Sequence, residues 1–223
     1  MGLTAKDSGG GDFKKVPPGV HVARCIRVID LGTQDVEFQG ETKQQHKVLI
    51  TWEVLGEDDA GVPMTAEVNG VQMPLTVSKR YTMSLSTKAR LRADLAAWRG
   101  RDFTGEELKA FDVSKLLGAY CMLNAQLNEG QNGKVYTNVV SITPLPREIA
   151  KHKPEGVHEL QMFDIDSPDM GLFETFYDKL QDTIKASAEW KALHSPRAAA
   201  TTAAPTLAKA STSFDDMDDD IPF

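Results

Sequence analysis

Cysteine is scarce in this sequence, in which Cys25 and Cys121 are the only two among 223 residues. A disulfide scaffold needs more cysteines than this, and a thiolate metal site needs a closer spacing. Both lie in segments with the pattern of strands, so we expect two buried free thiols in a reducing compartment.

Long apolar runs are also missing, because no stretch approaches the 18 apolar residues of a membrane-spanning helix. The first 15 residues lack the apolar core of a secretory signal. We therefore expect a cytoplasmic protein without a membrane partner.

The short motifs that mark common active sites are absent. The patterns G-x-x-x-x-G-K-[ST], G-x-G-x-x-G, H-E-x-x-H and G-x-S-x-G do not occur. The aspartates near the C-terminus lack the alternating spacing and the glycine of a calcium loop. The five histidines are scattered, at His21, His46, His152, His158 and His194. We therefore expect a protein that is not an enzyme and that carries no metal or other cofactor.

Charge of both signs is present, but it is unevenly distributed. Residues 1–150 carry 18 Lys and Arg against 18 Asp and Glu. Residues 151–223 carry 7 against 14 and account for the whole net charge of −7. A balanced body with an acidic appendage differs from a uniformly acidic protein, because the body can still present a local basic face.

The first two thirds of the chain read mainly as strands. A helical period over 87–100 predicts one helix capped by Ser86 and closed by Gly100, with a second short helix after Thr104. Asn69-Gly70 predicts an inserted hairpin. Five segments are β-branched and apolar and are bounded by Gly, Pro, Asn or Asp, at 19–32, 46–56, 77–85, 118–128 and 134–146.

Five strands with a helix between the third and the fourth have the order of the OB-fold, a small and partly open barrel. The sequence therefore predicts a mainly β protein whose OB-fold domain covers residues 17–146. Residues 1–16 are rich in Gly and Lys and are predicted to form a disordered arm.

The segments after this domain have other compositions. Residues 194–213 are rich in Ala, Thr, Ser and Pro, which predicts a flexible tether, and residues 214–223 form an acidic tip. Residues 147–193 are predicted to be a linker and one amphipathic helix that packs on the barrel, contacts a partner or joins two copies of the chain. The apolar stripe of that helix contains Leu172, Phe176, Leu180 and Ile184.

The predicted barrel offers the two ingredients of single-strand binding, which are cations for phosphates and aromatic rings for bases. OB-folds use the face of strands two and three and the neighbouring loops. The cations in these places are Arg24, Arg27, Lys43, Lys47, Lys79, Arg80 and Lys134. The aromatic residues among them are Phe38, Trp52, Tyr81 and Tyr136.

Strand parity separates these candidates, because alternate residues face opposite sides of a strand. Trp52 shares its side with apolar neighbours, which favours a core position over a stacking position, and Tyr81 fits either. The opposite parity places Arg80 outside, where it can contact a phosphate. Phe38 lies in a polar segment and is the better stacking candidate, whereas the side of Tyr136 stays open.

The last ten residues read FDDMDDDIPF, with five aspartates and then three residues that are not acidic. The final six resemble the tail of bacterial single-stranded DNA-binding proteins, in which an OB-fold is followed by a tether and an acidic tip ending Asp-Ile-Pro-Phe. They are Asp218, Asp219, Asp220, Ile221, Pro222 and Phe223. The body, with its excursion near 56–76 and its extra helix near 170–191, is more similar to the single-stranded DNA-binding proteins of bacteriophages.

This resemblance implies a sequence-independent single-stranded DNA-binding protein of phage DNA replication, recombination and repair, in the cytoplasm of an infected bacterial cell. It also implies that Phe223 fills a pocket on replication or repair proteins while Asp218 to Asp220 meet a basic rim. One alternative is an interaction protein that captures or blocks such proteins through the tip without binding DNA. A recombination mediator that anneals strands, RNA as ligand, and a homodimeric assembly also stay open.

Overall fold

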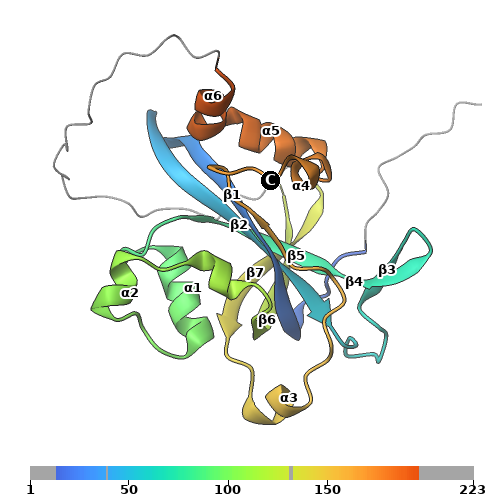
Figure 1. Cartoon of the computed structure of the whole chain (residues 1–223). Helices are drawn as coiled ribbons and strands as arrows, with labels where there is room; N and C mark the ends of the chain where they lie inside the picture. Colours follow the sequence, from blue (N-terminus) through green and yellow to red (C-terminus); the bar gives the residue numbers. More distant parts are fainter. Residues whose placement is uncertain (1–13, 39, 131–132, 196–223) are drawn as a thin grey trace, which may run out of the picture.

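A mainly antiparallel β-sheet organises the chain, with helices on two sides of it (Figure 1). The computed structural model describes residues 14–38, 40–130 and 133–195, so the predicted tether and tip, and nearly all of the predicted N-terminal arm, lie outside the described residues. Within them, no helix combines the length and the apolar character needed to cross a membrane.

The elements follow one another in the predicted order, with additions. The strands are β1 (Gly19–Phe38), β2 (Glu41–Leu55), β3 (Thr65–Val68), β4 (Val71–Pro74), β5 (Thr76–Thr82), β6 (Tyr120–Glu129), β7 (Val135–Thr143) and β8 (Gln161–Phe163). The helices are α1 (Arg90–Arg99), α2 (Gly105–Lys109), the 3-10 helix η1 (Val113–Leu116), α3 (Arg147–Lys151), α4 (Met170–Glu174), α5 (Asp178–Ala186) and α6 (Ala188–His194).

The main sheet has the strand order β5-β2-β1-β6-β7, and β8 pairs in parallel with β1. Because each step along this order is antiparallel, the edge strands β5 and β7 run parallel to each other. No backbone ladder joins these two edges in the described part of the chain, so the sheet is not a closed barrel. A side chain crosses the gap instead, since Lys79 of β5 donates to the carbonyl of Val139 on β7 at 3.1 Å. Arg90, the first residue of α1, also donates to β7, at the carbonyl of Val140 at 2.5 Å.

β1 and β2 are longer than predicted. The polar residues 33–45, expected to be a connection, continue both strands as a paired arm from Thr33 opposite His46 to Phe38 opposite Glu41. An arm with polar side chains does not need the apolar pattern from which strands are predicted. A bulge at the start of the arm contains Gly32, whose φ of 67° and close approach to Ser187 leave no room for a Cβ.

Local signals predicted some element ends and not others. Gly100 ends α1 in the left-handed region, Thr104 caps α2 with a capping box, and Asn69-Gly70 forms the turn of the β3–β4 hairpin, as predicted. The prediction for Ser86 is wrong, because α1 begins after Ala89 and has no side-chain cap.

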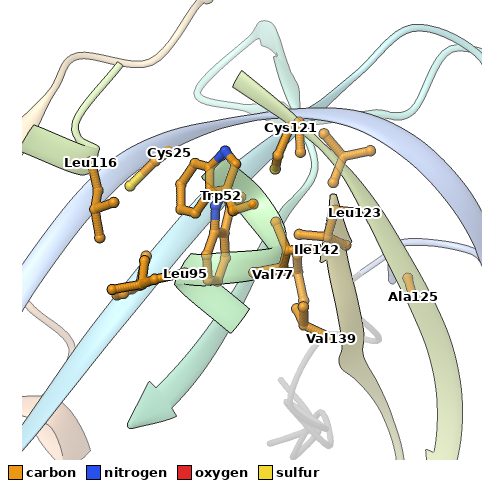
Figure 2. Close-up of a cluster of buried hydrophobic side chains, with 14 of the residues drawn as sticks. Cys25, Trp52, Val77, Leu95, Leu116, Cys121, Leu123, Ala125, Val139 and Ile142 are labelled. Atoms are coloured by element: carbon orange, nitrogen blue, oxygen red, sulfur yellow. The ribbon is translucent and has the colours of Figure 1, made fainter. Parts of the chain in front are cut away.

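One face of β1 and β2 carries the larger core, which α1 covers. Leu91, Leu95 and Trp98 of α1 are buried in it, and Trp52 lies at its centre (Figure 2). The two cysteines are buried free thiols, as expected, and burial raises the pKa of Cys25 to about 12.

The opposite face of β1 and β2, called here the outer face, carries a second core. Ile29, Leu31 and Leu49 pack there against residues 153–195, called here the C-terminal layer. The buried partners from this layer are Phe163, Ile165, Phe173, Phe176, Leu180, Ile184 and Trp190. Figure 1 shows α4, α5 and α6 on one side of the sheet and α1 and α2 on the other.

The prediction of one continuous C-terminal helix is wrong, because the chain leaves the helical region at Tyr177 and again at Ser187. Three helices result, and the predicted linker contains α3 and β8. Packing on the sheet is nevertheless one of the roles that the sequence left open, and the predicted stripe provides buried residues of the second core.

Candidate nucleic-acid interface

The C-terminal layer covers only part of the outer face. Paired residues on neighbouring strands point to the same side, so Lys47–Thr82, Leu49–Arg80 and Thr51–Ser78 form three outward rows across β2 and β5. Leu49 is buried under the layer and Thr51 is also buried, whereas Ser78 is exposed and Lys47, Arg80 and Thr82 are half-buried. We name Lys47, Thr51, Ser78, Arg80 and Thr82 the β2–β5 strip.

The strip is basic and rich in hydroxyl groups. Lys47 Nζ donates to Thr82 Oγ1 at 2.8 Å, Thr82 Oγ1 donates to Gln45 Oε1 at 3.2 Å, and the hydroxyls of Thr51 and Ser78 lie 2.8 Å apart. β5 contains no Asp or Glu. Ammonium, guanidinium and hydroxyl groups are the side-chain donors that contact nucleic-acid phosphates. The strip therefore has the chemistry of a phosphate-binding surface.

Arg27 borders the strip, opposite Thr51. Its Nε donates to Gln161 Oε1 at 2.7 Å, and its guanidinium carbon lies 6.0 Å from the ring centre of Phe176. Burial lowers the pKa of Arg27, and the neighbouring Tyr177 hydroxyl acts in the opposite direction. The C-terminal layer thus holds this predicted site residue at the edge of the strip.

Arg24 was predicted to contact DNA, but the structure does not place its side chain where it could do so. Its side chain is 15% exposed, and it donates to Glu53 Oε1 at 2.6 Å and to the carbonyl of His158 at 2.5 Å. Glu53 is fully buried and also accepts from the amides of Val157 and His158 and from the His158 ring. Arg24 therefore anchors the C-terminal layer to the sheet, and a phosphate contact does not fit this position.

Glu53 is ionised in this network for a physical reason. Burial alone would raise its pKa, but the His158 amide and ring, the Val157 amide and the charge of Arg24 together lower the pKa below its ordinary value. Hydrogen bonds to a carboxylate favour its charged form. The network is thus a buried ion pair of Arg24 and Glu53, in which the carboxylate also accepts the hydrogen bonds of Val157 and His158.

The stacking predictions for Trp52 and Tyr81 have to be corrected, because both rings belong to the core. Trp52 is 0% exposed and packs 5.9 Å from Trp98, centre to centre, while Tyr81 is 1% exposed and donates to Asp94 at 2.8 Å. Burial first, and Asp94 next, raise the pKa of Tyr81 well above its ordinary value. Neither ring can reach a base. Lys79 is also removed from the outer face, because it binds Asp94 at 3.0 Å on the inner side.

The remaining candidates lie on two hairpins. Phe38 ends β1 opposite Glu41, and its side chain is outside what the structure describes. Lys43 lies on the β1–β2 arm, 4.0 Å from Glu41, and Lys134 and Tyr136 lie on the β6–β7 hairpin. Their contact with DNA stays a prediction. The partner-binding residues Asp218, Asp219, Asp220, Ile221, Pro222 and Phe223 lie outside the described residues.

Sequence reasoning missed Tyr177, which is 59% exposed and directly follows Phe176, whose ring centre lies 6.0 Å from the guanidinium carbon of Arg27. A continuous helical pattern placed it beside an apolar stripe, and no local signal indicated that the chain would bring it to β1. The position of Tyr177 depends on the packing of its segment against β1, which lies about 150 residues earlier in the sequence.

Over the described ranges, no group of His, Cys, Asp and Glu side chains could hold a metal ion. Compared with known proteins, the sequence matches no family model, and no curated protein is significantly similar to it. The assignment of the interface therefore depends on geometry and residue chemistry.

Proposed function

We propose that the protein binds single-stranded DNA without sequence preference, in phage DNA replication, recombination or repair, and that the β2–β5 strip is its main contact surface. The observation that carries this proposal is the row-by-row placement of cations and hydroxyl groups on two adjacent strands, where Ser78 is exposed and Lys47, Arg80 and Thr82 are half-buried. Such groups neutralise and position a phosphate backbone without reading base edges.

The topology supports the proposal. The strand order, the helix α1 between β5 and β6, and the parallel edge strands support the OB-fold as part of the proposal, with the side chain of Lys79 linking β5 to β7. In this assignment β2 and β5 are strands two and three, where OB-folds bind oligonucleotides.

Residues 218–223 are the proposed contact for replication and repair proteins. Their carboxylates suit a basic rim, and the apolar Ile-Pro-Phe suits a small pocket inside it. This part of the proposal, like the phage setting and the bacterial cytoplasm, is supported by the sequence resemblance.

The test is a fluorescence-anisotropy titration of labelled oligo-dT at low salt, with the full chain and with a chain that ends at Ser213. We expect micromolar or tighter binding by both, and equal or tighter binding by the shortened chain, because the removed aspartates repel phosphates.

No binding by either chain at low salt would contradict the proposal and favour an interaction protein that acts through the tip alone. Annealing of two complementary strands, measured in the same buffer, would identify a recombination mediator.

A further inference from the structure

Tyr177 occupies a position at which another residue type is expected. It is the N-cap of α5, where Ser, Thr, Asp or Asn normally accepts a hydrogen bond from the first turn. The other two helices of the C-terminal layer follow this rule, since Asp169 caps α4 and Ser187 caps α6. The Tyr177 side chain makes no such bond. A residue that departs from a local rule of this kind often has a functional role.

The ring of Tyr177 does not contribute much to the core beneath it. The residue is 59% exposed, whereas Phe176 before it is 5% exposed and packs edge-on against Phe163 and Phe173. Among the aromatic residues whose side chains the structure describes, Tyr177 alone is classed as exposed. It therefore presents a ring face to solvent that the fold does not need.

The contact between Phe176 and Arg27 relates this ring to the strip. The guanidinium carbon of Arg27 lies 6.0 Å from the ring centre of Phe176, and Tyr177 is the next residue along the chain. On the sheet, Arg27 is opposite Thr51, which is opposite Ser78. The register of the sheet thus leads from Arg27, next to Phe176, across β2 to Ser78 on β5.

We infer that Tyr177 is a base-stacking site, so that the C-terminal layer forms part of the interface with single-stranded nucleic acid. A strand with one base on this ring brings a neighbouring phosphate to Arg27 and continues over the exposed hydroxyl of Ser78 toward Arg80. Every base has a π face, so this contact adds affinity without sequence preference. The inference depends on the proposed function and extends its site.

Removing the charge of Asp178 gives a second test of whether a base stacks on Tyr177. It is the first residue of α5 and is exposed beside Tyr177. A carboxylate next to the stacked base repels the phosphates on either side of that base. Asp178→Asn is therefore expected to tighten binding, and most strongly at low salt.

The experiment measures the affinity of full-length variants for labelled oligo-dT at one fixed low salt concentration. Because a stacked base contributes strongly to affinity, Tyr177→Ala should weaken binding about 5- to 150-fold. Tyr177→Phe should bind like the wild type. Leu193→Ala is the matched control, since Leu193 is 52% exposed on α6 of the same layer, and its affinity should not change.

A fluorescence readout separates stacking from a change in folding. Trp52, Trp98 and Trp190 are all buried, so a tryptophan introduced by Tyr177→Trp adds a signal from the surface. Oligo-dT should quench this added emission, whereas the emission added by Leu193→Trp should not change. Equal urea midpoints for the variants and the wild type would show that each is folded.

Two results would overturn the inference, and they differ from each other. In the first, the wild type binds oligo-dT, Tyr177→Ala binds equally well, and the emission of Tyr177→Trp is not quenched. The stacking site is then wrong, whereas the proposal that the β2–β5 strip binds single-stranded DNA still stands. If the wild type itself does not bind oligo-dT, the proposed function fails and the stacking site fails with it.

Discussion

At the scale of single residues, Glu53 shows how one buried charge fixes the position of a segment. Its carboxylate accepts hydrogen bonds from Arg24 on β1 and from Val157 and His158, which follow Glu53 by more than 100 residues in the sequence. Because the oxygens are fully buried, each donor that they lose leaves a charge or a polar group without compensation.

Glu53→Gln is expected to lower the free energy of unfolding by about 3 kcal/mol, because it leaves Arg24 buried without its counter-charge. Urea unfolding measures this cost, and Glu57→Gln, on an exposed residue nearby, is the control. A cost equal to that of the control would mean that the network does not anchor the C-terminal layer.

His46 predicts a pH dependence of stability. Its Nε2 lies 2.6 Å from Asp30 Oδ1 and its Nδ1 lies 3.8 Å from Glu189 Oε1 on α6. The hydrogen bond to Asp30 raises the pKa of His46 above 6.5, although burial opposes this. The charged form therefore stabilises the fold below about pH 6.5, and this contribution is lost as pH rises through the folded-state pKa.

Compared with His46→Gln, the wild type should be more stable near pH 6 by about 0.5 kcal/mol, a small value because the pair is partly exposed. The difference should disappear near pH 9. Urea unfolding of both proteins across this range is the measurement, and a difference that grows with pH would contradict the assignment.

At the scale of elements, the sequence predicted strands better than it predicted what covers them. Val48, Leu49 and Ile50 are apolar at successive positions, which indicates a strand buried on both faces. The pattern does not say which segment covers the second face. The apolar stripe of the C-terminal layer was visible, but the breaks at Tyr177 and Ser187 were not, because neither residue is Gly or Pro.

Ile184→Ala tests whether the C-terminal layer unfolds together with the sheet. Ile184 is fully buried in the second core, so the substitution should cost about 2–4 kcal/mol. Asp182→Ala, at an exposed position of the same helix, should have little effect. Two separate unfolding transitions in urea would contradict a single cooperative unit.

At the scale of the whole molecule, the site combines residues that the sequence could and could not assign. Parity placed Arg80 on the outside because that depends only on strand alternation. Arg24 and Lys79 are cations of the right strands, but buried carboxylates bind them, and no local pattern predicts such partners. Tyr177 joins the site only through packing between distant segments.

The distribution of charge has a consequence for binding. The body is electrically balanced, and several of its cations are held by acidic partners, among them Arg92 by Asp102 and Arg99 by Glu107. The cations proposed to neutralise phosphates are Arg27, Lys47 and Arg80, which lie on or beside the β2–β5 strip.

The measurement that tests this account most directly is the affinity for oligo-dT as a function of salt concentration. For three neutralised phosphates, log K against log salt should have a slope of about −2, falling to about −0.7 in the double variant Lys47→Ala/Arg80→Ala. The control Lys109→Ala/Lys151→Ala removes two exposed cations that pair with Glu106 and Glu148, and it should keep the wild-type slope. Equal slopes for the wild type and Lys47→Ala/Arg80→Ala, or no binding at any salt concentration, would contradict the claim that the β2–β5 strip binds single-stranded DNA.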